Sequence, residues 1–458
     1  MKQVHLPVIS KLSKEYKIEV VTVVDKSSDF DNINGDLHNF GIYGLISTIK
    51  VEDNDFFDSY KISANFKIKL DSIVLNNYIN GVIISIDPLY QYAYIEWAIK
   101  RGLNVFADKP LTFIPYINKN RDHFTKLFLD AKYLYELSNT YRDYQTNNKL
   151  IIMVFTQRRF QKCYEEILKQ VQKVSNKTTY PISYLHMLHN DGQYHKPEEY
   201  FKSGVHSFLN GRGKLAHTGY HIVDIAMRTV LSSYSQLESI DKIEVECQVT
   251  KPKDLINLYN NTDTCKYFMP CNEIKNDENI LETMGEVDVF ATIRIICKSS
   301  ITSTIRLDML HSGYSERYEQ NKQFNNNVNP FGRVKHESLK LYQGPFQYIH
   351  LEKRRGRKEL INTSQYLSEL HIVRNCSILD NLEECSVNKK FYEYENGLQK
   401  DRVECIEAFI KGIKNNTSDY LKSSLESHLI SIQIYAAIYN SIITERKVII
   451  KDLVNKYD

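Results

Sequence analysis

A lysine at position 109 stands where a parallel sheet would bind a ligand. Lys109 directly follows the apolar run at residues 103–107 (LNVFA), and Pro110 after it restricts the lysine backbone to extended conformations. An apolar run of this length is typical of a buried parallel strand, and open α/β sheets bind ligands beyond the carboxyl ends of such strands. Lys109 is therefore a candidate site residue. The alternative is an exposed loop lysine beside its neighbour Asp108.

A second candidate site lies between residues 213 and 228. If this segment is helical, His217, His221, Asp224 and Arg228 are spaced by four, three and four residues, so their side chains share one face. Two histidines and an acid in adjacent turns can titrate near neutrality, as acid–base chemistry requires. The same stripe would also suit a solvated helix face or a structural histidine. The His-x3-His spacing would suit a metal, but the sequence offers no further convincing ligand.

The first third of the chain must position Lys109, and it alternates strand-like and helix-like stretches. The predicted strands are residues 18–24, 81–86, 103–107 and 149–156. Helices are predicted at residues 92–100 and 121–144, the first ending at Gly102. Strands separated by helices predict an α/β architecture, with a parallel sheet covered on both faces.

Beyond about residue 157 the pattern changes to runs of strands with helices outside them. After a helix at residues 160–174, strands are predicted at residues 182–188, 242–250, 287–298, 300–309 and 341–351. Residues 251–280 and 311–340 are predicted surface loops, and residues 402–443 a largely helical tail broken near Asn415 to Ser418. We therefore expect two domains: an α/β domain at residues 1–157 and an α+β domain at residues 158–458.

The composition excludes several classes of protein. Of 458 residues, 42% are hydrophobic and 25% are charged, so the chain can bury sizeable cores and should not be disordered. Lys+Arg 59 against Asp+Glu 56 leaves a formal charge of +3, which gives no reason to expect a nucleic-acid partner. No run approaches the ~18 apolar residues of a membrane helix, and no signal peptide opens the chain. We expect a cytoplasmic protein that binds a small molecule, with no membrane partner.

Cysteine spacing and two weaker motifs complete the survey. The eight cysteines include no CxxC pair, so we expect reduced, mostly buried thiols. The basic run from Lys353 to Lys358 could meet nucleic acid or an anionic ligand, although a solvated loop is the simpler interpretation. His189, Asp191 and Gly192 follow a predicted strand and could line a substrate pocket, but a plain turn explains the Asn-Asp-Gly sequence equally well.

Taken together, these motifs resemble the Gfo/Idh/MocA family of NAD(P)-dependent oxidoreductases, which includes glucose–fructose oxidoreductase and inositol dehydrogenase. Residues 81–112 resemble the segment from the family's fourth Rossmann strand to its Glu-Lys-Pro motif, which is Asp-Lys-Pro here. Residues 149–160 resemble the last Rossmann strand and the Arg-Phe after it. Residues 213–224 resemble the Gly-x-x-x-Asp-x-Gly-x-His-x-x-Asp helix, and residues 423–442 the closing helix.

The resemblance implies a fold, a cofactor and roles for individual residues. It implies an incomplete Rossmann-type, doubly wound parallel sheet followed by an α+β domain with a largely antiparallel open sheet, which pairs subunits in a homo-oligomer. It also implies NAD or NADP as cofactor and a hydroxylated, sugar-like or polyol substrate. Lys109 would polarise the substrate oxygen, and His221 would be the general acid/base. The cofactor would contact Asp25, Asp87, Pro88, Asp108 and Lys109, and the substrate Arg159, His217 and Asp224.

Two departures from the family pattern affect these expectations. His217 stands where the family has an acid four residues before His221, so the usual carboxylate support is missing. The family's first strand and Gly-x-Gly-x-x-Gly loop are also missing, because the sequence starts at about the helix that follows them, near Val4 to Leu6. That strand is central in a doubly wound sheet, and its loop receives the cofactor pyrophosphate. We expect either a truncated or incorrectly started product, or a variant that binds no dinucleotide; the alternative function is then an inactive ligand sensor or scaffold.

Overall fold

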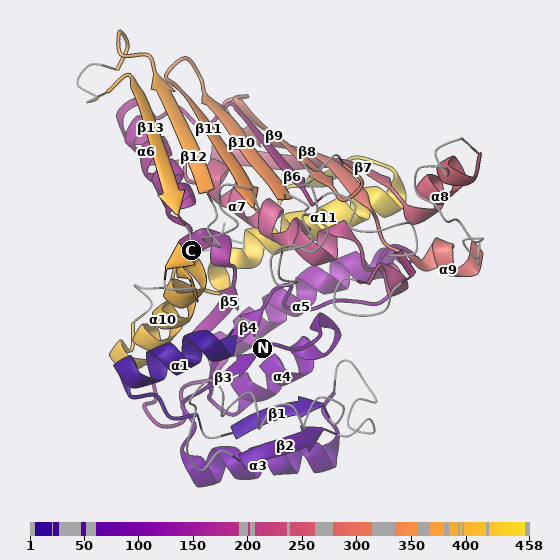
Figure 1. Cartoon of the computed structure of the whole chain (residues 1–458), viewed down its shortest axis with the longest axis vertical. Coiled ribbons are helices and arrows are strands. Elements are labelled where there is room, and N and C mark those ends of the chain that lie inside the picture. Colours follow the sequence, from indigo (N-terminus) through magenta and orange to yellow (C-terminus); the bar gives the residue numbers. More distant parts are fainter. Residues whose placement is uncertain are drawn as a thin grey trace, which may run out of the picture. The chain divides into compact units, whose positions relative to one another are not determined.

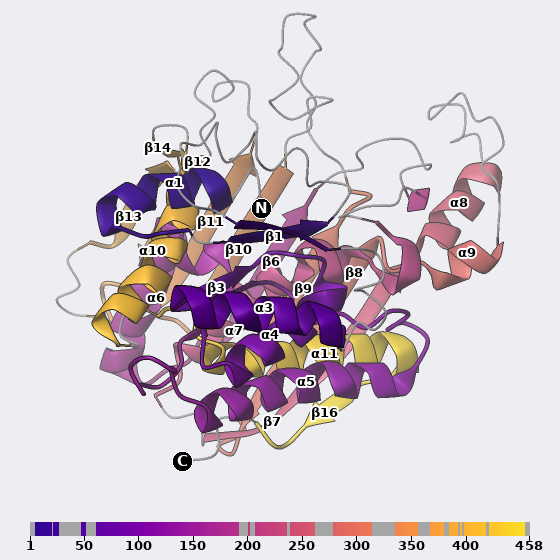
Figure 2. The same cartoon turned by 90° about the horizontal axis from the view of Figure 1, so that it is seen from below.

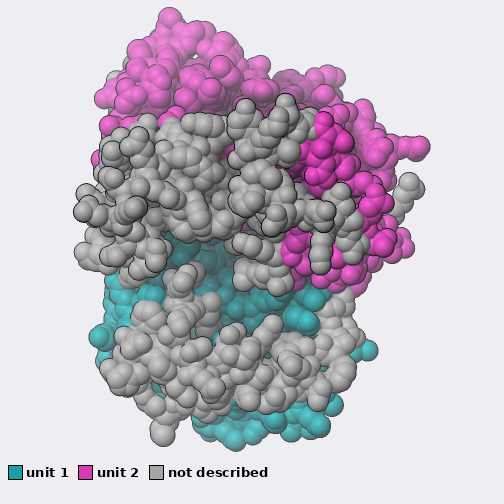
Figure 3. All heavy atoms as spheres, turned by 45° about the vertical axis from the view of Figure 1, so that its right-hand side comes forward, with its two compact units in different colours: residues 1–113, 129–160, 398–428 teal, residues 114–128, 161–397, 429–458 magenta. Residues whose placement is uncertain are grey.

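The computed structural model describes most of the chain, and it forms two compact units (Figure 3). The described residues are 5–20, 22–26, 47–51, 61–191, 200–201, 207–235, 239–261, 278–313, 335–355, 367–379, 384–392, 394–395, 398–417 and 421–453. Unit 1 comprises residues 1–113, 129–160 and 398–428, and unit 2 comprises residues 114–128, 161–397 and 429–458. The division into domains at residues 157 and 158 stays a prediction.

The parallel strands of unit 1 form two separate sheets (Figure 1). The strands are β1 (Thr22–Lys26), β2 (Ser47–Val51), β3 (Gly81–Ile84), β4 (Asn104–Asp108) and β5 (Ile152–Phe155). β1 pairs with β2, while the other sheet has the order β3-β4-β5. Successive residues of β4 and β5 are buried, as expected for parallel strands covered on both faces. The predicted incomplete parallel sheet is therefore confirmed.

Helix α1 packs against strands of both parallel sheets. The helices of unit 1 are α1 (His5–Tyr16), α3 (Ala64–Asn77), α4 (Pro88–Lys100) and α10 (Lys400–Asn415), with short turns η2 (Gln157–Phe160) and η10 (Glu426–His428). Leu6 and Ile9 of α1 form a buried cluster with Val23 of β1, against which Ile83 of β3 packs. A second face of α1 packs into another buried apolar cluster of unit 1, which includes Phe106. An apolar cluster therefore connects the two sheets.

A segment late in the chain, at residues 421–428, completes unit 1 at the open edge of β5. The Val154 N–H donates to the Ser423 carbonyl over 2.9 Å, and the Leu425 N–H donates to the Ile152 carbonyl over 2.9 Å. Met153 and Ser424 form an antiparallel bridge between these segments. Residues 398–428 thus satisfy backbone groups that an edge strand would otherwise expose.

Unit 2 is built on one nine-stranded sheet with the order β13-β12-β11-β10-β6-β9-β8-β7-β16 (Figure 1). Its strands are β6 (Tyr184–Asn190), β7 (Ile240–Thr250), β8 (Asp288–Cys297), β9 (Thr302–Leu310), β10 (Lys335–Gln343), β11 (Gln347–Arg355), β12 (Leu367–Arg374), β13 (Ser386–Tyr392) and β16 (Val448–Ile450). The β6–β9 pair is parallel, and the other described pairs are antiparallel. This confirms the predicted largely antiparallel open sheet.

Helices cover one face of this sheet. The helical segments of unit 2 are α6 (Lys162–Thr178), η4 (Leu209–Gly211), η5 (Leu215–Gly219), α7 (Tyr220–Leu231), α8 (Pro252–Asn261), α9 (Glu278–Thr283) and α11 (Leu429–Thr444). Helix α5 (Arg121–Thr140) has residues in both units, and β14 (Tyr394–Glu395) and β15 (Leu398–Gln399) are short strands. Residues of β8 and β9 alternate between buried and partly exposed, which is typical of a sheet with one covered face. Figure 1 shows α6, α7 and α11 on that covered face.

Several element predictions were wrong in detail. The predicted strand at residues 341–351 is the hairpin of β10 and β11, because Gly344 adopts a positive φ of 52° and starts a turn. The predicted loop at residues 251–280 contains α8 and the start of α9, which lie side by side (Figure 2). Helix α5 ends at Thr140 instead of Tyr144. The predicted break in the tail is confirmed, since α10 ends at a left-handed Asn416.

The cysteine prediction was only partly correct. The free cysteines Cys163, Cys247, Cys297 and Cys405 are buried, as expected. Cys376 and Cys385 instead form a disulfide between the end of β12 and the start of β13. Cys265 and Cys271 lie outside the described residues. No helix within the described ranges is long and apolar enough to cross a membrane.

Candidate functional site

Local structure fixes the backbone around Lys109 at the carboxyl end of β4. Asp87 caps the first turn of α4, where its side chain accepts the Leu89 N–H over 3.0 Å and Pro88 occupies the first helical turn. The buried Gln91 of α4 donates from Nε2 to the Pro110 carbonyl over 3.0 Å. The Lys109–Pro110 peptide is cis. Lys109 therefore lies where the sequence predicted it, at an edge of the sheet that binds ligands in open α/β folds.

Asp108 connects the end of β4 to β3 and to α1. Its carboxylate accepts the Ser85 hydroxyl over 2.6 Å, and His5 Nε2 lies 3.3 Å from the other oxygen. Burial raises the pKa of Asp108, but the hydrogen bonds from His5 and Ser85 outweigh it and hold this pKa below its usual range. Because His5 begins α1, the amino terminus of α1 lies at the carboxyl edge of the β3-β4-β5 sheet.

The other predicted cofactor residues lie at corresponding places. Asp25 is near the carboxyl end of β1, in register with Lys50 of β2. Asp87 and Pro88 begin α4 directly after β3. The structure therefore places these residues at carboxyl ends of parallel strands, although Asp87 also has the structural role of a helix cap.

Arg159, a predicted substrate residue, uses its guanidinium within the protein. It is almost fully buried, and its Nη1 donates to the Lys422 carbonyl over 3.0 Å and to the Ser427 hydroxyl over 2.6 Å. Its Nη2 donates to the Ser427 carbonyl and to His428 Nδ1, each over 3.1 Å. The geometry supports a structural role for Arg159, holding residues 422–428 against η2.

Ser423 and His428, beside Arg159, are close enough to be a nucleophile and its general base. The direction of the hydrogen bond between them excludes that role. Ser423 Oγ and His428 Nε2 are 2.7 Å apart, and both side chains are fully buried. Arginine can only donate, so His428 Nδ1 accepts from Arg159 and Nε2 carries the ring proton toward Ser423. Ser423 in turn donates to the Val154 carbonyl over 2.6 Å. His428 therefore cannot remove the serine proton, and this chain of hydrogen bonds is structural.

In unit 2, the segment that carries His217 is a π-helical turn before α7. The Tyr220 N–H donates to the Leu215 carbonyl five residues back. The prediction of one regular helix was therefore wrong for His217, because a π-turn shifts the four-residue spacing to His221 out of the α-helical register. His217 Nε2 donates to the Ser207 carbonyl over 2.9 Å, and its ring packs edge-on against Phe208.

The two remaining predicted residues lie on α7 itself. His221 and Asp224 are 5% and 1% exposed, so these two members of the polar stripe are buried. π-Helical turns within helices occur frequently at functional sites. Their roles as general acid/base and substrate residue stay proposals.

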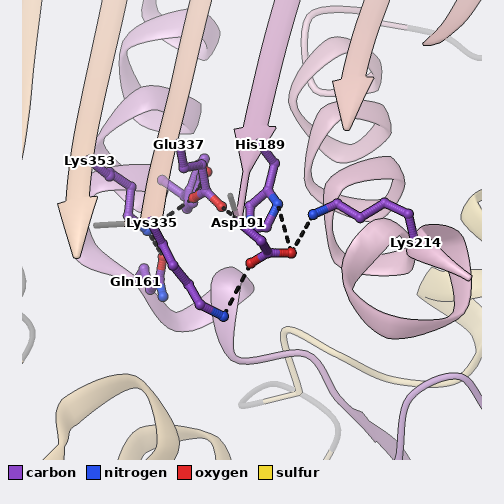
Figure 4. A network of polar contacts seen from close by, with 8 residues as sticks. Gln161, His189, Asp191, Lys214, Lys335, Glu337 and Lys353 are labelled. Carbon is purple, nitrogen blue, oxygen red and sulfur yellow. Dashed lines mark hydrogen bonds and ion pairs between the residues drawn. The ribbon is translucent and has the colours of Figure 1, made fainter. Parts of the chain in front are cut away.

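Figure 4 shows a group of charged side chains in unit 2 that we call the charged cluster. Its members are His189 and Asp191 at the end of β6, Lys335 and Glu337 on β10, Lys353 on β11, and Lys214 just before η5. Lys214 forms a buried ion pair with Asp191, and Lys335 Nζ lies 3.1 Å from the second oxygen of that carboxylate. His189 Nδ1 is 3.9 Å from Asp191.

Glu337 is the second anionic centre of the charged cluster. It accepts the Tyr164 hydroxyl over 2.7 Å and lies 3.2 Å from Lys353 Nζ. His189 Nε2 is 3.9 Å from its other oxygen, so this ring lies between the two carboxylates. Lys353 also donates to Gln161 over 2.5 Å.

Electrostatics keeps Asp191 of the charged cluster ionised. Burial raises the pKa of Asp191, but the charges of Lys214 and Lys335 outweigh this effect and hold it well below its usual value. Burial lowers the pKa of Lys214, and the Asp191 charge opposes that change. The ammonium of Lys214 is 1% exposed, whereas Lys353 and Lys335 are 12% and 32% exposed. Lys335 and Lys353 are thus the members able to donate to a bound ligand.

Sequence reasoning found only part of the charged cluster. It named His189 and Asp191 as weak candidates, and the structure brings both into the group. It missed Lys214 because no spacing pattern connects this residue to Asp191. Lys335 and Glu337 alternate along β10, which is a signal for one shared face, but they fall in a segment predicted as a loop. Within the described ranges, no three His, Cys, Asp or Glu side chains are arranged to hold a metal ion.

Comparison with known proteins shows what this fold is similar to. No protein-family model and no curated protein matches the sequence. Among solved structures, a myo-inositol dehydrogenase from Corynebacterium glutamicum is similar with a TM-score of 0.51 and 12% identity, covering 98% of this chain and 97% of that one. An oxidoreductase from Agrobacterium radiobacter in complex with NAD+, L-tartaric acid and magnesium has a TM-score of 0.51 and 12% identity, covering 93% and 90%.

A third similar structure is a super-repressor mutant of Gal80p from Saccharomyces cerevisiae. Its TM-score is 0.56 and its identity 10%, and the match covers 97% of this chain and 93% of that one. These similarities span nearly the whole chain at low identity. They confirm the resemblance to Gfo/Idh/MocA-type oxidoreductases at the level of the fold.

Proposed function

We propose that the protein is an NAD(P)-dependent oxidoreductase acting on a hydroxylated, sugar-like or polyol substrate. The observation that carries this proposal is the placement of Lys109, which ends the middle strand of a parallel sheet next to a fixed Asp108 and Pro110. The similarity of the fold to a myo-inositol dehydrogenase and to an NAD+-bound oxidoreductase supports it.

Each site residue has a distinct task in the proposed reaction. The Lys109 ammonium donates a hydrogen bond to the substrate oxygen and stabilises negative charge that develops on it. His221 exchanges the proton of that hydroxyl as general acid/base. A bound nicotinamide would supply or accept the hydride.

The described residues fit a dinucleotide in part. The amino terminus of α1 lies at the carboxyl edge of the β3-β4-β5 sheet, and helix amino termini favour phosphate groups. The buried Nδ1 of His5 has no hydrogen-bond partner among the described residues. Asp25 at the end of β1 suits a ribose hydroxyl.

Titration with NAD and NADP, followed by turnover of a panel of polyols and aldoses, tests the proposal. We expect binding of one dinucleotide and reduction by at least one substrate of the panel. His221→Asn should lower kcat far more than it lowers cofactor affinity, and Lys109→Met should lower kcat/KM. Lys132→Met, an exposed lysine of α5, is the matched control and should change neither. No binding of either dinucleotide would overturn the proposal.

A ligand sensor or scaffold without turnover is the second candidate function. The separation of the parallel strands into two sheets and the similarity to a super-repressor favour it. A sensor would bind a sugar-like ligand, as seen by calorimetry or a thermal shift, without any change in nicotinamide absorbance. Substrate-dependent reduction of NAD or NADP would exclude this function.

A further inference from the structure

The π-turn that leads into His221 is tied to the rest of unit 2 by two buried acids. Lys214 is the residue before this turn, and His221 is the second residue of the helix after it. A displacement of the turn would therefore displace the imidazole. Nothing in the spacing of the sequence supplies this support, because the residue four positions before His221 is His217, whose Nε2 is bonded to the Ser207 carbonyl.

Glu286 supplies the first tie, through the backbone. Its carbonyl accepts the Lys214 N–H over 2.7 Å, and its side chain accepts the Leu215 N–H over 2.8 Å. A carboxylate that accepts an N–H at the start of a helix caps it. The approach is close, since a Cβ on Gly213 would lie 2.3 Å from the Glu286 nitrogen. Glu286 therefore fixes where the turn starts.

Asp191 supplies the second tie, through the side chain of Lys214. The ammonium of Lys214 is bonded to Asp191 Oδ2, and both side chains are buried. Asp191 is fixed in turn, because its N–H donates to the Leu310 carbonyl over 3.0 Å and its other oxygen pairs with Lys335. The ion pair thus connects the π-turn to the ends of β6 and β9 (Figure 4).

We infer that the buried Lys214–Asp191 pair positions His221 for proton transfer, and so replaces the carboxylate missing at position 217. The inference rests on the proposed function of His221. Lys214 and Asp191 are positioning residues, since they act through the π-turn. A catalytic group displaced by about 1 Å can cost roughly 100-fold in rate, so loosening this turn should affect kcat.

Three variants separate positioning from stability. Lys214→Met removes the ammonium and leaves Asp191 buried beside Lys335, so it should lower both the melting temperature and kcat. The double variant Lys214→Met with Asp191→Asn removes both charges, which usually restores stability because no buried charge stays unpaired. Lys214→Arg keeps the ion pair. Lys389→Met is the matched control, since it breaks an ion pair with Glu166 that connects β13 to α6.

The expected result is a melting temperature that recovers in the double variant while kcat stays at least tenfold low with KM unchanged. Lys214→Arg should recover kcat, and Lys389→Met should not change it. Recovery of kcat together with the melting temperature in the double variant would overturn the inference, because the pair would then only stabilise the fold.

Hydrogen exchange of the backbone amides of residues 215–221 tests the tie without any turnover. The double variant should exchange these amides at least tenfold faster than the wild type, while amides of β8 stay unchanged. Faster exchange in the double variant, found together with a wild type that shows no dinucleotide-dependent turnover, would overturn the proposed function and support the tie. Unchanged exchange would overturn the tie, whatever the activity.

Discussion

The strands of the two units are stabilised in different ways. Unit 2 has one continuous sheet of nine strands, in which β6 and β9 in the middle are paired on both edges. In unit 1, β1-β2 and β3-β4-β5 are separate, and an apolar cluster from α1 connects them. Residues 421–425 then cover the outer edge of β5. The sheets of unit 1 are therefore held in place by side-chain packing and by a chain segment that is distant in sequence. The sheet of unit 2 is held together by hydrogen bonds between its own strands.

The polar networks of the two units differ in the same way. In unit 1, Arg159 donates to His428, which donates to Ser423, and this chain ends on a backbone carbonyl. Each of these hydrogen bonds connects two segments of the chain. In unit 2, the charged cluster balances three lysines against two carboxylates and a histidine, and Lys335 and Lys353 are partly exposed. The first network suits a structural role, and the second suits the binding of a polar ligand.

The largest expected loss of stability comes from removing Arg159 from the hydrogen-bond network of unit 1. Arg159→Met should lower the free energy of unfolding by about 4 kcal/mol, because the buried His428 Nδ1 and the part-buried carbonyls of Lys422 and Ser427 lose their donor. Denaturant unfolding followed by circular dichroism measures this loss. Arg142→Met, an exposed arginine of the same unit, should cost less than about 1 kcal/mol. Equal losses in the two variants would contradict the structural role of Arg159.

The buried cap of unit 2 should give the next largest effect, and only at high pH. Burial raises the pKa of Glu286 from 4.5 to about 7. The folded state therefore holds the proton more tightly than the unfolded state, and this contribution to stability is lost as the pH rises from 4.5 to 7. Glu286→Gln keeps the acceptor for the Leu215 N–H without this loss. At pH 8 it should be up to about 3 kcal/mol more stable than the wild type, and near pH 4.5 about equal.

Unfolding curves of both proteins between pH 4.5 and 8 measure that difference. Glu286→Ala is the control, since it removes the cap and should be less stable than Glu286→Gln at every pH. A constant difference between wild type and Glu286→Gln across this range would show that Glu286 does not titrate there.

A matched pair of valines tests the comparison of the sheets directly. Val245 of β7 is fully buried in the continuous sheet, whereas Val23 of β1 is buried in the cluster between the separate sheets. Val245→Ala should cost about 2 kcal/mol and Val23→Ala about 1 kcal/mol, because a less tightly held site can relax around the cavity. Denaturant unfolding measures both values. A larger loss for Val23→Ala would mean that the α1 cluster is the better packed of the two regions.

The smallest effect is expected at the carboxyl edge of the parallel sheet. Ser85→Ala removes one hydrogen bond to Asp108 and should cost about 1 kcal/mol at pH 7. Because this bond lowers the pKa of Asp108, its contribution is present above the unfolded pKa and is lost as the pH falls through the folded pKa. The difference between Ser85→Ala and wild type should therefore vanish in acid. A difference independent of pH would point to packing instead.

Sequence reasoning predicted the strands best where apolar residues run together. The runs that became β3, β4 and β5 were found because burial on both faces demands consecutive apolar residues. The β10–β11 hairpin was misread because both strands alternate and their turn depends on one residue, Gly344. The π-turn at residues 215–219 was missed because the spacing of His217 and His221 fits a regular helix equally well.

By itself, the amino-acid pattern determined the class of fold and the position of Lys109 at the end of a strand. Each of these follows from neighbouring residues, whose burial and backbone preferences are local. Only the tertiary structure decided the partners of Arg159, the pairing of Asp191 with Lys214 and Lys335, and the pairing of Glu337 with Lys353. These residues lie far apart along the chain, and what brings them together is the packing of the sheets and helices that carry them, which leaves no periodic signal in the sequence.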